Sequence, residues 1–109
     1  CGQGLSITYR DVRIVSDLLK STNDWTPSLF APYAEERSER MRRLRFSASL
    51  TSSLDAEFNE AARARRASYF ARAAADPTLG THGIVAMVGP EMVPPEFFTP
   101  EHRARVLEG

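Results

Sequence analysis

Residues 33–54 read YAEERSERMRRLRFSASLTSSL, and this stretch decides the fold. Four of its apolar residues recur at helical spacing, namely Tyr33, Met41, Leu44 and Ala48. Between them stand acid-first pairs such as Glu36 and Arg40, which stabilise an exposed helix by about 0.3–0.5 kcal/mol per pair. The pattern predicts one long helix with an apolar stripe on one side and charged residues on the other.

A second amphipathic pattern precedes this stretch. Between residues 4 and 20, apolar residues recur at spacings of three and four: Leu5, Tyr9, Val12, Val15 and Leu19. Residues 21–24 are a loop signal that ends this helix. Thr26 and Pro27 fit the next helix start, because threonine can cap and proline suits the first turn. Pro32 either kinks that helix or separates a short helix from the long one.

A third helix and a tail are predicted after residue 54. Asp55 can cap the helix and Asp76 stops it, and its expected buried side consists of Phe58, Ala62, Tyr69 and Ala73. In the tail, the apolar run 84–88 fits a helical turn or a strand, and Thr99 opens a last helix to about Leu107. We therefore predict a mainly α fold, with three substantial helices and a Pro/Gly-rich tail that carries a short terminal helix.

Composition narrows the class of protein. The chain has 109 residues, of which 42% are hydrophobic and 26% charged, which is typical of one small folded domain. Fourteen basic residues balance fourteen acidic ones, so net charge favours neither nucleic acid nor an anionic membrane. The single cysteine, Cys1, excludes an intrachain disulfide and leaves too few thiols for a zinc finger. Without a membrane-length apolar run or a signal-peptide pattern, we expect a cytoplasmic location.

Few residues indicate catalysis or metal binding. The two histidines, His82 and His102, are predicted to lie on the surface, because they lack further ligands at a suitable spacing. The arginines between residues 37 and 45 could follow phosphates, but three glutamates lie within residues 35–45, so a solvated helix face is favoured over nucleic-acid binding. Arg37 falls on the apolar stripe and is expected to have a carboxylate or carbonyl partner, or to extend outward to water.

The strongest candidate site lies at the start of the chain. Two glycines stand directly before the first helix, whose N-terminus has unpaired amides and a partial positive charge. Glycine lets a planar or anionic ligand approach the backbone closely. The candidate cofactor-binding residues are Gly2, Gln3, Gly4, Leu5 and Ser6. By itself the pattern fits a loop or a trimmed end equally well, and the start at Cys1 rather than methionine suggests a piece of a longer protein.

The segment 2–6, followed by Arg10-Asp11-Val12-Arg13, resembles the late flavin-contacting stretch of single-component FAD-dependent monooxygenases of the para-hydroxybenzoate hydroxylase type. Later stretches are also similar to that family: residues 30–37, 41–46, 89–91 and 94–96. The resemblance covers most of the chain, as the C-terminal portion of an α/β FAD-binding fold. It implies that residues 1–54 end the FAD-binding domain and that residues 55–109 form a C-terminal helical region and tail.

The resemblance implies a role in NAD(P)H- and O2-dependent oxygenation of a small organic substrate, with FAD bound in the parent enzyme. The amides of Gly4, Leu5 and Ser6 would face the electron-rich edge of the flavin, and Gly2 and Gln3 would shape the turn. Ser6 stands where the family commonly has asparagine, so no amide side chain is available there. Cys1 stands where the family commonly has glycine.

Much of the family's machinery is absent from these 109 residues, including the G-x-G-x-x-G dinucleotide fingerprint and the substrate-binding sheet. We therefore expect the chain alone to bind FAD weakly and to be inactive, with the rest of the parent FAD-binding domain as its partner. The alternative is a self-sufficient helical protein-interaction module without catalysis, suggested by the Arg/Glu-rich helix and the apolar stripes.

Overall fold

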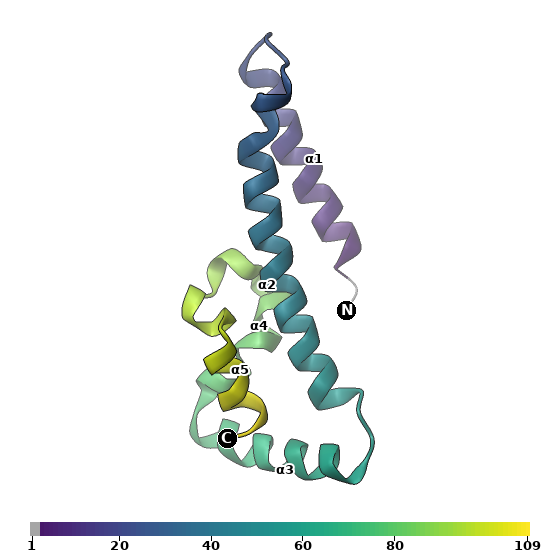
Figure 1. The fold of residues 1–109 in the computed structure, drawn as a ribbon, viewed down its shortest axis with the longest axis vertical. Helices are drawn as coiled ribbons and strands as arrows, with labels where there is room; N and C mark the ends of the chain where they lie inside the picture. The colour runs from purple at the N-terminus through teal and green to yellow at the C-terminus, as the bar shows by residue number, and fades with distance from the viewer. Residues whose placement is uncertain (1–2) are drawn as a thin grey trace. The chain divides into compact units, whose positions relative to one another are not determined.

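The computed structural model describes residues 3–109, and this part of the chain contains helices and no strand (Figure 1). Five α-helices occur in it: α1 (Gly4–Ser21), α2 (Ala31–Asp55), α3 (Glu60–Ala75), α4 (Thr81–Val88) and α5 (Pro100–Leu107). Four short 3-10 helices join them: η1 (Pro27–Phe30), η2 (Pro77–Gly80), η3 (Pro90–Met92) and η4 (Pro95–Phe98). The predicted mainly α fold is confirmed.

The chain forms two compact units, Cys1–Met41 and Arg42–Gly109, and α2 contributes residues to both. In the first unit, α1 and the first part of α2 run antiparallel beside each other (Figure 1). The ring N–H of Trp25 closes the connection by donating to the carbonyls of Leu19, at 3.0 Å, and Thr22, at 2.9 Å. These bonds satisfy carbonyl groups that the end of α1 leaves without helical partners.

The start of α2 settles the two possibilities that Pro32 left open. Pro27 begins the short helix η1, and α2 starts afresh at Ala31 with Pro32 in its first turn, where a missing N–H costs nothing. Thr26 makes no side-chain cap bond to the backbone, because its hydroxyl lies 2.8 Å from the hydroxyl of Ser28.

The second unit encloses the hydrophobic core, in two clusters. The first joins α2, α3, η2 and α5 through Leu50, Leu54, Tyr69, Leu79 and Val106. The second contains Val85, Val93 and Phe98, against which Leu44 and Phe46 of α2 pack. Burial of this apolar surface is the main force that folds the unit.

The buried side of α2 differs from the predicted stripe. Tyr33, Met41, Leu44 and Ala48 are only half-buried, whereas Leu50 and Leu54 are fully buried. Leu50 and Leu54 face α3 and α5, elements whose positions the local spacing of α2 does not encode.

The predicted cap of α3 is wrong. Asp55 is the last residue of α2, so α3 begins later and Asn59 is its cap, accepting a hydrogen bond of 2.8 Å from the amide of Ala62. Phe58, predicted to be buried, therefore precedes the helix and is exposed. Ala62 and Tyr69 are buried as predicted.

In the tail, the run 84–88 is helical and belongs to α4. Gly89 ends that helix with φ +92°, a conformation that side-chain-bearing residues rarely adopt. Thr99 caps α5 as predicted, because its hydroxyl accepts from the amide of His102 at 3.2 Å.

Replacing Leu50 with alanine tests the core. Leu50 has no exposed surface, so Leu50→Ala should lower the free energy of unfolding by about 2–5 kcal/mol, measured by urea denaturation followed by circular dichroism. The matched control is Met87→Ala, which removes an exposed side chain and should change stability by less than about 0.5 kcal/mol. Equal losses in the two variants would contradict the assigned core.

Candidate functional site

The N-terminus of α1 has amides that are not used within the helix. The first helical hydrogen bond runs from the amide of Ile7 to the carbonyl of Gln3 at 2.9 Å. The amides of Gly4, Leu5 and Ser6 precede this first donor and therefore have no acceptor within the helix. Gln3, the residue before the helix, makes no side-chain cap bond, and the first turn contains no acidic residue. The partial positive charge of this helix end is thus not offset by a carboxylate of its own first turn.

The same helix end is open in the first unit. A Cβ atom built on Gly4 would meet nothing within 4 Å, and Leu5 and Ser6 are exposed. The structure thus brings Gly4, Leu5 and Ser6 together at one accessible helix end, with half-buried Gln3 beside them. Gly2, the fifth predicted cofactor-binding residue, lies outside the described residues.

An ion network fixes α1 against the first part of α2. Asp11 accepts from Nε of Arg37 at 3.0 Å and also pairs with Arg40. Glu36 accepts from Nε of Arg10 at 3.1 Å and from Nε of Arg40 at 3.0 Å. The Arg10–Asp11 pair of the resemblance therefore joins α1 to α2, and Asp11 is the carboxylate partner expected for Arg37.

Burial and hydrogen bonding oppose each other in this network. Burial raises the pKa of Asp11, but hydrogen bonds from Arg40 and Arg37 outweigh it and leave that pKa below its usual value. Burial lowers the pKa of Arg40, but bonds to Asp11 and Glu36 reverse this and raise it. Arg40 is only 5% exposed, so the prediction of a solvated face is wrong at this residue.

Two more arginines of residues 37–45 bind backbone carbonyl groups in the second unit. Arg42 donates to the carbonyl of Phe98 at 3.1 Å, and Arg43 donates to the carbonyl of Pro90 at 3.3 Å. The guanidinium of Arg43 also lies over the ring of Phe98, 5.0 Å from its centroid. These groups hold the tail against α2, so much of the basic segment is engaged with the protein itself.

A pocket of about 390 Å³ lies beside the first turns of α1 and is lined by Ser6, Tyr9, Arg10 and Arg13. It adjoins an apolar stripe whose members are strongly exposed: Leu5 at 67%, Tyr9 at 68% and Val12 at 57%. The predicted apolar face of this helix is thus partly uncovered in the described chain, and it lies next to the open helix end.

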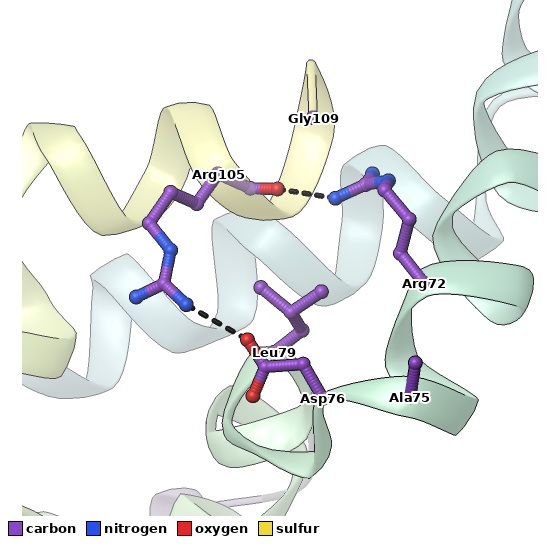
Figure 2. Close-up of a pocket in the computed structure, with 6 residues that line it drawn as sticks. All are labelled: Arg72, Ala75, Asp76, Leu79, Arg105 and Gly109. Atoms are coloured by element: carbon purple, nitrogen blue, oxygen red, sulfur yellow. Dashed lines mark hydrogen bonds and ion pairs between the residues drawn. The ribbon is translucent and has the colours of Figure 1, made fainter.

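A second pocket, of about 320 Å³, lies in the other unit between α3, η2 and α5 (Figure 2). Arg105 donates to Asp76 at 2.8 Å, and Arg72 donates to the carbonyls of Arg105 and, at 2.8 Å, Val106. Hydrogen bonds from Thr78 lower the pKa of Asp76. Both guanidinium groups are engaged with protein acceptors, so this pocket is a weaker candidate for ligand binding than the end of α1.

The predicted surface location is wrong for His102, and His82 is half-buried. His102 is only 3% exposed, and Nδ1 of His82 is also buried. Burial lowers the pKa of both imidazoles. Sequence spacing does not reveal this burial, because His82 lies against Tyr69 and His102 against Thr81, residues that are distant in the sequence.

Comparison of the chain with protein-family models, curated proteins and solved structures finds no match. Within residues 3–109, no group of three or more His, Cys, Asp or Glu side chains is arranged to hold a metal ion. None of the helices in this range is both long and apolar enough to cross a membrane.

Replacing Asp11 with asparagine tests the ion network. Asp11→Asn should destabilise the first unit by about 1 kcal/mol at pH 7, measured by urea unfolding followed by the fluorescence of Trp25. The pKa of Asp11 is lowered in the folded chain, so its contribution is present above the unfolded value of 3.8 and is lost as the pH falls through the folded value.

The matched control is Asp17→Asn, which removes an exposed carboxylate from the same helix and should leave stability nearly unchanged. The two variants should converge in strongly acidic solution. A difference between them that persists there would show that Asp11 stabilises α1 by something other than its charge.

Proposed function

We propose that the start of α1 contacts the flavin ring of FAD in a monooxygenase that uses NAD(P)H and O2, and that this chain is the C-terminal part of that enzyme. The observation that carries the proposal is the accessible helix end at Gly4, Leu5 and Ser6, with no side-chain cap from Gln3. The second support is the resemblance of residues 2–6 and of Arg10-Asp11 to the flavin-contacting stretch of that family.

The residues present fit an electron-rich ring. Bound FAD supplies the redox chemistry and the reaction with O2, whereas the chain supplies oriented amides. A helix terminus favours a nearby anion by about 0.3–1 kcal/mol, and α1 is 18 residues long with no acidic residue in its first turn. Open space above Gly4 allows a planar group to approach the backbone.

The ion network of Asp11, Glu36 and Arg40 supports the same role. It ties α1 to α2 one to two turns after the helix start. Amides that are already oriented stabilise charge without a reorganisation cost during the reaction. Under this proposal, Asp11 and Arg40 are positioning residues that hold the helix end in place.

The exposed stripe of Leu5, Tyr9 and Val12 supports a partner on the same side of α1. Apolar side chains at helical spacing are normally covered in a folded protein. Under the proposal, the rest of the parent FAD-binding domain covers them, together with the pocket at Tyr9 and Arg13.

The isolated chain should bind FAD only weakly, because the groups that hold the adenine and pyrophosphate lie outside it. Titration of the chain into FAD, followed by quenching of flavin fluorescence, should give no saturation at micromolar concentrations. Tight binding of FAD by the isolated chain would contradict the proposal that most of the FAD site lies outside these residues.

Ser6→Asp, made in the intact enzyme, tests the contact directly. A carboxylate in the first turn would oppose the negative charge of the reduced flavin and should lower its midpoint potential by about 10–20 mV, equivalent to about 0.5–1 kcal/mol for two electrons. The matched control is Ser38→Asp, which adds the same charge at an exposed position of α2 and should leave the potential unchanged. Equal shifts of the midpoint potential in both variants would contradict the proposed contact between the start of α1 and the flavin.

The alternative, a protein-interaction module, has its own support in the second unit. That unit closes two hydrophobic clusters and still exposes the large apolar side chains Met87 and Met92. Sedimentation and thermal unfolding distinguish the two proposals. A cooperative transition with a defined oligomer favours the module, and a poorly cooperative, aggregating chain favours the enzyme fragment.

A further inference from the structure

Two imidazoles, half-buried in His82 and buried in His102, lie in the first turns of two helices of the second unit. His82 is the second residue of α4, and His102 is the third residue of α5. The contact between the helices runs through His102, whose Nε2 lies 3.2 Å from the hydroxyl of Thr81 at the start of α4. A helix N-terminus disfavours a cation, so both imidazoles stand where an added positive charge is costly.

The hydrogen bonds of His102 define its neutral form. The hydroxyl of Thr81 lies 3.1 Å from the carbonyl of Thr78, to which it donates. Nε2 of His102 must then carry the hydrogen that it donates to Thr81, which leaves Nδ1 as the nitrogen that can gain a proton. That Nδ1 is buried and has no hydrogen-bond partner in the described chain. A proton there would create a charged donor without an acceptor inside the unit.

His82 differs in part, because it is half-buried and the carbonyl of Leu79 favours its protonated form. Its Nδ1 is buried without a hydrogen-bond partner in the part of the chain that the structure describes, and its ring packs against Tyr69 with centroids 5.9 Å apart. Burial lowers the pKa of His82, opposed by the carbonyl of Leu79 and by the charge of Asp55. Burial is the largest effect, so the neutral ring is favoured.

On balance, the surroundings of His102 also lower the pKa of its imidazole. Burial lowers its pKa most, and Arg105 on its own helix and His82 from α4 lower it further. Asp76, before η2, raises it. The remaining close neighbour is the ring of Phe97, 5.1 Å away and edge-on, which is apolar. Protonation of one histidine also hinders protonation of the other while the helices stay packed.

We propose that His82 and His102 form an acid-sensitive latch, in which protonation of the imidazoles releases the start of α5 from Thr81 at the start of α4 and opens the second unit. Separation of the helices would return each imidazolium to water and remove the unsatisfied donor at Nδ1 of His102. The ion network of the first unit contains no histidine, so the latch acts on the second unit. The inference does not depend on the proposed flavin contact.

The direction of the pH dependence follows from proton linkage. Both pKa values lie below the unfolded value of 6.5, so the open state binds more protons and stability falls as the pH drops below that value. Each histidine can raise the unfolding constant by up to about tenfold per pH unit, and the pair by up to about a hundredfold. Asp11 and Asp76, the carboxylates with lowered pKa, change the stability only near and below pH 3.8. The interval from pH 6.5 to 5 therefore isolates the effect of the histidines.

The experiment uses the full chain and its two histidines. Amide hydrogen exchange at Val85 and Val106, corrected for the intrinsic pH dependence, measures opening of the second unit. Fluorescence of Trp25, the single tryptophan, follows the first unit as an internal control. Between pH 6.5 and 5, protection at Val85 and Val106 should fall by at least tenfold, while the signal of Trp25 stays constant.

Glutamine variants separate protonation from packing. His102→Gln retains a side-chain N–H for Thr81 but cannot gain a proton, so it should fold at pH 7.5 and lose much of the acid response. His82→Gln should remove the rest of the acid response. The stability of the double variant should not depend on pH over this interval. Lys20, an exposed residue of α1, provides the control Lys20→Gln, which should leave the acid response intact.

Several results would overturn the latch. One is a histidine NMR titration in which both rings titrate at or above 6.5. Another is undiminished protection at pH 5, or an acid response that survives in the double glutamine variant. Absence of protected amides at Val85 and Val106 at pH 7.5 would also overturn it, because the second unit would have no closed state for protonation to open.

Discussion

The buried guanidinium of Arg40 requires carboxylates, and this requirement determines how α1 lies against the first part of α2. A buried cation without a partner is strongly destabilising, and Asp11 and Glu36 supply the compensating charges. The pair of Asp11 with Arg40 forms with α1 antiparallel to the first part of α2. The same arrangement leaves the amides of Gly4 to Ser6 open at the helix end. Placement of the proposed flavin contact therefore follows from an ion pair that has no chemical role of its own.

Arginines perform a second structural task, which is to bind carbonyls at the ends of helices. Arg65 donates to the carbonyl of Ser53 at 2.9 Å and Arg66 to that of Leu54 at 2.5 Å, both in the last turn of α2. Arg72 does the same for Val106 near the end of α5. The planar guanidinium has several donors in a fixed arrangement, so one side chain can satisfy carbonyls that a helix leaves unpaired. This use explains why an arginine-rich, electrically neutral chain need not be a phosphate-binding protein.

The two units use polar burial differently. In the first unit, charges are buried with partners of opposite sign and are stabilised by ionisation. In the second unit, burial lowers the pKa of half-buried His82 and of buried His102 and so favours their neutral rings. The ion network therefore favours carboxylates that keep their charge, whereas the surroundings of the histidines favour the uncharged form. Under the proposed latch, mild acid acts on the second unit before the carboxylates of the first unit titrate.

The sequence by itself determined the helices, because spacing, proline positions and loop residues are local signals. It placed α1, the end of α3 at Asp76 and the start of α5 at Thr99, whereas it left open whether Pro32 kinks a helix or begins a new one. It also located the open helix start at Gly4, since glycine and the first amides of a helix are read directly from the chain. The role of that site in flavin binding stays a prediction.

Tertiary structure alone decided what each helix buries. Leu50, Arg40 and His102 are buried because segments distant in sequence pack over them, and periodicity within one helix contains no record of those neighbours. The cap of α3 is Asn59 and not Asp55, because Asp55 ends α2 and residues 56–59 connect the two helices. Burial, and with it the charge state of an ionisable side chain, is a property of contacts between elements, so the structure was needed to reveal the ion network and the two neutral histidines.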